Sequence, residues 1–264
     1  MKNVLVLVHD DQEEDARLQV ALDLTKAVSG HLQCLHVVVP SEEMGHYFDD
    51  ANNAVLDLVR GRVTQHRTRV EDRLRGEGVC WSFTERLGSL NNELIGASEL
   101  ADVIVLSVPA HRGDGQARHL IGEVAVKTRR PVLVVPPTCS GLNVSGAALV
   151  AWDGSHPASE ALHSAVPLLQ HASSVTLLEL NAPISQAPVR EAASYLSRHG
   201  VHAEIVKESS LAPVSQAIVD KAHAIGAAYV VIGAYGLPRW VESFFGGVTD
   251  GMLLRTDLPI LLAH

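Results

Sequence analysis

The chain has 264 residues, of which 47% are hydrophobic and 4% aromatic, and its formal net charge is −9. This negative balance argues against a general nucleic-acid-binding surface, and no apolar run approaches the roughly 18 residues that cross a bilayer. The first apolar run is short and is followed at once by Asp10 and Asp11. It therefore lacks the core and the cleavage site of a signal peptide, and we expect a cytoplasmic protein.

The first half of the chain alternates strand-like and helix-like segments. Short apolar runs predict strands over 4–8, 32–39, 79–86, 103–108 and 132–135. Helical periodicity predicts helices over 12–29, 44–74, 90–100 and 120–129, of which 44–74 is one long helix or two short ones. A polar loop is expected over 111–119. Pro136 and Pro137 then lead into a stretch that is typical of a linker.

The second half begins the same alternation again. Strands are predicted over 148–152, 175–180, 201–207, 229–232 and 260–263, and helices over 157–170, 187–198, 213–223 and 247–254. The strand at 103–107 aligns with the one at 229–233, and the strand at 131–134 aligns with 259–262. Repeated β-α units predict an α/β fold of two tandem, doubly wound parallel-sheet domains, over 1–137 and 146–264, with helices on both faces.

Neither the cysteines nor the histidines show the spacing of a metal site. Cys34, Cys80 and Cys139 are far apart and form no CxxC pair, so we predict buried free thiols. The fourteen histidines include no HExxH or similar close pattern. A GxSxG nucleophile elbow is also missing. We therefore assign no metal ligand and no catalytic residue.

Asp153, Gly154 and Ser155 directly follow the first strand of the second half. In an open α/β sheet, ligands bind beyond the carboxyl ends of the strands. A carboxylate at that place could accept hydrogen bonds from an adenine amino group or from ribose hydroxyls. The alternative is structural, because Asp and Ser are also favoured in turns and at helix N-caps.

Glycines flank the loop that follows the strand at 229–232. They are Gly233, Gly236, Gly246 and Gly247. Glycine lets the backbone approach a ligand closely, and the start of the next helix would present free N–H groups to an anion. We therefore expect a phosphate-binding loop in which Thr249 and Ser243 could donate hydroxyl hydrogens. The alternative is two flexible turns, since neither GxxxxGK[ST] nor GxGxxG occurs.

These patterns resemble the universal stress protein family in its tandem form. Nucleotide-binding members carry Gly, two residues, Gly, nine residues, Gly, and then Ser or Thr. Gly233, Gly236 and Gly246 match this spacing, whereas Gly247 stands in the place of the hydroxyl residue. The family's first-strand signature is matched by Asp153, Gly154, Ser155 and Ser159.

The resemblance implies a flavodoxin-like layout with five strands in each half. It implies that the second half binds ATP or another adenine nucleotide, with or without Mg²⁺. Asp153 would face the adenosine, and Gly233, Gly236, Gly246 and Gly247 would line the phosphates. The chain would be a stress-response regulatory protein without membrane or nucleic-acid partners. Its two halves would form an intramolecular pseudo-dimer through 132–135 and 260–263, and association into a homodimer stays open.

The first half departs further from the family pattern. Ser107 and Ala110 stand in the places of Gly233 and Gly236, while Arg118 and His119 stand in those of Gly246 and Gly247. His9 or Asp10 takes the place of Asp153. Side chains would crowd the site, so we predict that this half does not bind ATP in the family manner. Two alternatives for the whole chain are a slow ATPase and a nucleotide-free interaction or scaffold protein.

Overall fold

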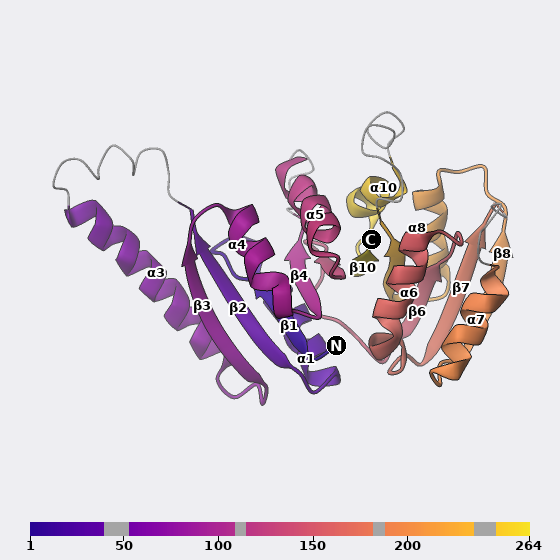
Figure 1. Ribbon diagram of the computed structural model, residues 1–264, viewed down its shortest axis with the longest axis horizontal. Helices are drawn as coiled ribbons and strands as arrows, with labels where there is room; N and C mark the ends of the chain where they lie inside the picture. The colour runs from indigo at the N-terminus through magenta and orange to yellow at the C-terminus, as the bar shows by residue number, and fades with distance from the viewer. Residues whose placement is uncertain (40–52, 109–114, 182–187, 235–246) are drawn as a thin grey trace.

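The computed structural model describes residues 1–39, 53–108, 115–181, 188–234 and 247–264 (Figure 1). Its described strands form one sheet in the order β3-β2-β1-β4-β5-β10-β9-β6-β7-β8. All neighbouring strands are parallel except β5 and β10, which pair antiparallel with Ile260 opposite Val134. The predicted pairing of 132–135 with 260–263 is therefore confirmed, and each half contributes five strands.

The first half contains strands β1 (Asn3–Leu7), β2 (His31–Val38), β3 (Cys80–Leu87), β4 (Val103–Ser107) and β5 (Val132–Val135). Its helices are α1 (Glu14–Ala27), α3 (Asn53–Leu74), α4 (Leu90–Ala97), the 3-10 turn η1 (Ser98–Leu100) and α5 (Gly115–Thr128). Helix α3 runs beside β3 at the outer edge of this half, away from the second half (Figure 1).

The second half repeats this order with β6 (Ala147–Ala151), β7 (Ser174–Leu180), β8 (Ala203–Glu208), β9 (Ala227–Gly233) and β10 (Ile260–Ala263). Its helices are α6 (His156–Leu169), α7 (Val189–Arg198), α8 (Val214–Ala224) and α10 (Val248–Arg255). Gly200 has a φ of 77° two residues after α7 ends, a left-handed conformation that is common where helices stop. The α/β fold with two doubly wound halves is thus as predicted.

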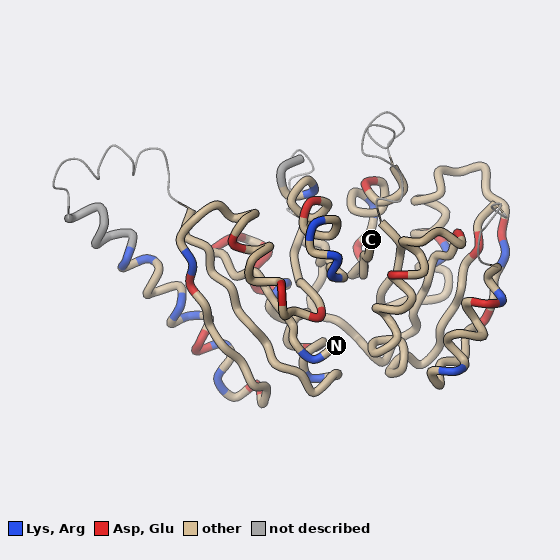
Figure 2. Tube along the Cα trace, viewed as in Figure 1, with Lys and Arg blue, Asp and Glu red and all other residues tan. Residues whose placement is uncertain are grey.

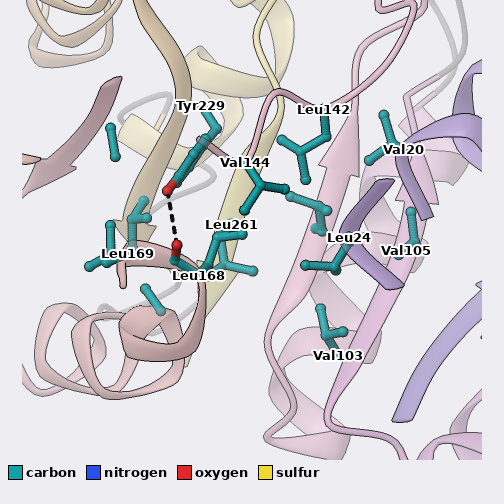
Figure 3. Close-up of a cluster of buried hydrophobic side chains, with 14 of the residues drawn as sticks. Val20, Leu24, Val103, Val105, Leu142, Val144, Leu168, Leu169, Tyr229 and Leu261 are labelled. Atoms are coloured by element: carbon teal, nitrogen blue, oxygen red, sulfur yellow. Dashed lines mark hydrogen bonds between the residues drawn. The ribbon is translucent and has the colours of Figure 1, made fainter. Parts of the chain in front are cut away.

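The core lies on the two faces of the sheet and continues across both halves. Along β1, Val4 and Val6 belong to the cluster on one face and Leu5 and Leu7 to the cluster on the other, as the period of a strand requires. Figure 3 shows the first face at the junction, where side chains of α1 approach Leu142 and Val144 of the linker, with Tyr229 and Leu261 beyond them. The two predicted domains therefore share one sheet and one continuous core on each face.

Hydrogen bonds and burial also hold the linker and β9 in place. The backbone N–H of Leu142 donates to Asp23 Oδ2 of α1 at 2.8 Å. The hydroxyl of Tyr229 in β9 points to the carbonyl oxygen of Leu168 at 3.5 Å (Figure 3), and burial raises the pKa of this phenol. A linker that is anchored in this way does not act as a flexible tether.

Two sequence-based predictions were wrong in detail. Helix α5 begins at Gly115, so the second part of the loop predicted over 111–119 is helical; the first part lies outside the described residues. Cys80 is exposed at the start of the edge strand β3, whereas Cys34 is buried and Cys139 half-buried. An edge strand has only one neighbour to cover its side chains, and that asymmetry is not visible in the local sequence. Over the described residues, no helix combines the length and apolar character needed to cross a membrane.

Candidate functional site

A pocket lies in the second half where the order of the strands reverses, which is where open α/β sheets bind ligands. Strand β6 has β7 on one side and β9 on the other, and the pocket of about 120 Å³ opens at the ends of these three strands. Its lining is apolar apart from Asp153, and it comprises Ala151, Trp152, Asp153, Ala158, Leu178, Leu180, Val214, Ile218, Ile232, Gly233 and Val248. The pocket volume is somewhat below the roughly 150 Å³ of an apolar cavity that holds one benzene molecule, so a planar ring would enter the pocket and project from its mouth.

The turn after β6 holds Asp153 at the mouth of this pocket. Gly154 adopts a φ of 73°, a left-handed conformation that favours glycine. Asp153 Oδ1 accepts a hydrogen bond from the N–H of Ser155 at 2.9 Å, and the side chain is otherwise exposed. Ser155 Oγ accepts from the N–H of Ala158 at 3.3 Å and so caps α6. The structural role expected for this motif is therefore present, and Asp153 also lines the pocket with an exposed side chain.

Gly233 ends β9 directly beneath the start of α6. A Cβ atom on this residue would lie 2.4 Å from the backbone nitrogen of Ala158 and 2.6 Å from the carbonyl carbon of Pro157. Such contacts are far inside van der Waals distance, so any larger residue would push α6 away from the sheet. The glycine is therefore required by helix-to-strand packing, whatever role it has toward a ligand.

The beginning of α10 forms another wall of the pocket, through Val248. Gly247 is the N-cap residue, and no side chain of the described residues caps the N–H groups of the first turn. These N–H groups carry partial positive charge and suit an anion. Thr249, one residue into α10 from Val248, is only 5% exposed. Gly236, Gly246 and Ser243 lie outside the described residues.

The fold thus brings Asp153, Gly233 and the N-terminus of α10 to one pocket, although they lie up to about a hundred residues apart in the chain. Gly154 and Ser155 shape the turn that carries the carboxylate. Among the predicted residues that the structure describes, Ser155 uses its hydroxyl as the cap of α6, and Thr249 is buried.

The corresponding place in the first half is filled by Arg17 of α1, which is 3% exposed. Its Nε donates to the carbonyl oxygen of Leu7 at the end of β1, at 2.5 Å, and its Nη1 donates to Ser107 Oγ at the end of β4. Its Nη2 pairs with Asp11 Oδ2 at 2.9 Å. A guanidinium therefore joins the ends of the two strands between which a ligand would enter.

Sequence analysis identified Ser107 as a departure from the glycine pattern but did not identify Arg17. The signal was present, because an arginine at a core-facing position of an otherwise apolar helix stripe needs acceptors inside the protein. Arg118 and His119, which were aligned with Gly246 and Gly247, lie inside α5 rather than before its first turn. Ala110 lies outside the described residues.

Comparisons with known proteins agree with this architecture. The model of the universal stress protein family matches residues 1–136. No curated protein matches the chain. A universal stress protein from Archaeoglobus fulgidus is similar in structure, with a TM-score of 0.73 and 17% identity over 99% of this chain and 95% of that one.

Two further solved structures share the arrangement over the full length. A putative universal stress protein from Pseudomonas aeruginosa UCBPP-PA14 has a TM-score of 0.60 and 18% identity, over 100% of this chain and 93% of that one. The cytoplasmic domain of a prokaryotic cation chloride cotransporter has a TM-score of 0.51 and 14% identity, over 99% of this chain and 94% of that one. At these identities the likeness concerns the fold alone.

Proposed function

Because the chain belongs to the universal stress protein family, we propose that it is a regulatory protein whose second half binds an adenine nucleotide, ATP in the first instance. The observation that carries this proposal is the pocket bounded by Asp153 on one side and the uncapped start of α10 on the other. Asp153 can accept hydrogen bonds from the adenosine of a nucleotide, and the N–H groups at the start of α10 can donate hydrogen bonds to its phosphates.

The apolar lining and the size of the pocket indicate which part of the ligand it takes. A planar base fits among Leu178, Ile218 and Val248, with the carboxylate of Asp153 accepting from its amino group or from the ribose hydroxyls. The negative charge of Asp153 would repel phosphates, so the phosphate chain extends toward Gly247 and the N–H groups of α10. Gly236, Gly246 and Thr249 stay part of this proposal as the remainder of the phosphate site.

Mg²⁺, if it accompanies the nucleotide, would be held by phosphate oxygens and water, with Asp153 as the nearest carboxylate of the pocket lining. Such a cation would offset the repulsion between that carboxylate and the phosphates. The described residues that line the pocket include no second acidic group, so the phosphates and water would supply most of the ligands of the ion.

A nucleotide-free interaction protein is the second candidate, and one observation favours it. Gly233, the first residue of the glycine pattern, is explained fully by its contact with Ala158, so part of that pattern has a structural cause. A slow ATPase, which would hydrolyse the nucleotide bound in this pocket, is a third candidate.

The test is calorimetric titration of the purified chain with ATP, with and without Mg²⁺, together with mass spectrometry of any small molecule that copurifies. We expect saturable binding that Asp153→Ala weakens by about tenfold or more, since a charge-assisted hydrogen bond is lost. Asp220→Ala is the matched control, because Asp220 is an exposed carboxylate of α8 whose partner is Gln216. Absence of binding at millimolar ATP would favour the interaction protein, and phosphate release that disappears with Asp153→Ala would favour the ATPase.

A further inference from the structure

His9, His36 and His66, here called the histidine cluster, lie together inside the first half. His9 follows β1, His36 belongs to β2 and His66 to α3. The ring centroids of His36 and His66 are 4.7 Å apart, and those of His9 and His36 are 5.8 Å apart. The side chains of His36 and His66 are 9% and 4% exposed.

One ring nitrogen of each histidine has no hydrogen-bond partner among the described residues. These atoms are His9 Nε2, His36 Nδ1 and His66 Nδ1. Buried polar atoms are nearly always paired, because leaving one unpaired costs the solvation that it had in water. Three such atoms in one place therefore mark a site that is costly to maintain, and nucleotide binding in the second half does not account for it.

The cluster has an uneven set of charged neighbours. His66 Nε2 contacts Glu14 Oε2 of α1 at 2.5 Å, so a proton on His66 has a carboxylate to receive it. His9 faces Arg17 and Asp11, while His36 faces Glu14 and Glu85 as well as the other two rings. Arg69 of α3 reaches Asp10 at 2.7 Å and Glu14 at 3.9 Å. A second or third proton in the cluster would lie beside a ring that is already charged.

Helix α3 depends on this cluster for its position. From residue 60 onward, its buried side chains are only His66, Val70 and Leu74, one on each successive turn. Figure 2 shows positively charged residues along this helix, and the pair Arg69–Asp10 has partners that are 55% and 76% exposed. Exposed ion pairs contribute little to stability, so within 60–74 His66 is one of the three buried side chains that hold the helix against the sheet.

We propose that the histidine cluster is an acid-sensitive latch: when the cluster takes up protons, α3 undocks from the first half and uncovers Phe83 of β3. The ring of Phe83 lies 6.3 Å from that of His36 and 5.3 Å from the guanidinium of Arg67 in α3. Undocking would return His36 to water, where its ring can carry a charge at little cost.

The direction of the effect follows from burial. Desolvation, followed by the charge of Arg17, lowers the pKa of His9 from 6.5 to about 4. Desolvation, followed by the nearby His66, lowers the pKa of His36. The docked state therefore binds fewer protons than the undocked state below pH 6.5, and acid favours the state that binds more. Docking is fully favoured above about pH 6.5 and weakens as the pH falls toward 4.

A metal centre is the main rival explanation of three neighbouring imidazoles. Over the residues that the structure describes, no group of three His, Cys, Asp or Glu side chains is placed to hold a metal ion. The test nevertheless includes samples with EDTA and samples with added zinc, because a metal ion bound by these imidazoles would compete with protons for the ring nitrogens.

Hydrogen exchange of the full chain, read by mass spectrometry between pH 7.5 and pH 5.0 and corrected for the intrinsic exchange rate, tests the latch. We expect exchange in peptides covering 60–75 to rise about tenfold or more over this range, in the direction that the lowered pKa values of His9 and His36 give, while peptides of α6 and α7 stay unchanged. In the double variant His9→Gln/His36→Gln this rise should disappear. The matched control, His171→Gln/His202→Gln, removes two exposed histidines and should behave as the original chain.

Three outcomes would overturn the latch: protection of 60–75 that is independent of pH, a rise that the double variant retains in full, or a loss of protection that EDTA reproduces at pH 7.5 and zinc reverses. If the double variant does not fold, histidine proton titration by NMR of the unaltered chain gives the answer. At least two of the fourteen imidazoles should then titrate well below 6.5 in step with changes at α3, and titration of all of them near 6.5 would refute the proposal.

Discussion

Gly233 and Ala158 fix how closely the first helix of the second half approaches its sheet. A Cβ on Gly233 would lie 2.4 Å from the backbone nitrogen of Ala158, and this nitrogen donates its hydrogen to Ser155 Oγ, the cap of α6. One glycine therefore determines the position of the turn that carries Asp153. Stability and ligand binding are coupled at this residue.

Replacing Gly233 with alanine should destabilise the chain by about 1–3 kcal/mol, because the added methyl group meets backbone atoms that cannot rotate away. Urea unfolding followed by circular dichroism measures the effect. Gly61→Ala is the matched control: Gly61 lies in α3 with no atom within 4 Å of the added Cβ, so alanine there should stabilise the helix by about 0.5–1 kcal/mol. Equal effects of the two substitutions would contradict the packing explanation.

Replacing Arg17 with methionine should destabilise the first half by about 2–3 kcal/mol. The substitution leaves the carbonyl oxygen of Leu7 and the hydroxyl of Ser107 without their donor. The loss should stay below the roughly 3–5 kcal/mol that removing one partner of a fully buried ion pair costs, because the Asp11 side chain is 38% exposed and water can solvate it. Arg17→Lys keeps the charge but not the planar fork, and should recover only part of the stability in the same unfolding experiment. A cost below about 0.5 kcal/mol for methionine would show that Arg17 does not hold these strand ends together.

Introducing serine at Gly247 should strengthen ATP binding up to about tenfold, since it restores a hydroxyl at the start of α10 that can donate to a phosphate oxygen. The backbone permits it: Gly247 has φ −48° and ψ 154°, which serine adopts readily. Gly247→Ala, which adds the methylene without the hydroxyl, is the control. Equal affinities for the serine and alanine variants would exclude a phosphate contact at this position.

Lowering the pH from 7 to 5 should reduce the free energy of unfolding by about 2 kcal/mol through His9 alone. Its pKa is about 4 in the folded chain against 6.5 for the free group, so the unfolded chain binds the extra proton and gains stability as the pH falls. His36 shifts in the same direction and adds to the loss. Denaturant midpoints measured at several pH values check this, and a curve for His9→Gln as steep as that of the original chain would contradict it.

The sequence by itself determined the elements and their repetition, and its resemblance to a family indicated the pairing of 132–135 with 260–263. Strand and helix periods are local properties, and a run such as Val132–Val135 is apolar at every position because it is buried on both faces. Repetition of the β-α pattern predicted parallel sheets with helices on both faces, and the family resemblance implied the flavodoxin-like layout that the strand order shows. Asp153 and the start of α10 could be assigned to one ligand site for the same reason: residues after parallel strands meet at one edge.

Only the tertiary structure decided what fills each crevice and what each glycine contacts. Arg17 reaches Ser107 across 90 positions of the chain, and Glu14 reaches His66 across 52. No local pattern in the sequence encodes such pairings, because they depend on how closely α1, α3 and the sheet pack. The sequence shows a glycine at 233 but not why a glycine is needed there. The need arises only when α6 packs on β9, because the helix backbone then occupies the space that a side chain would take.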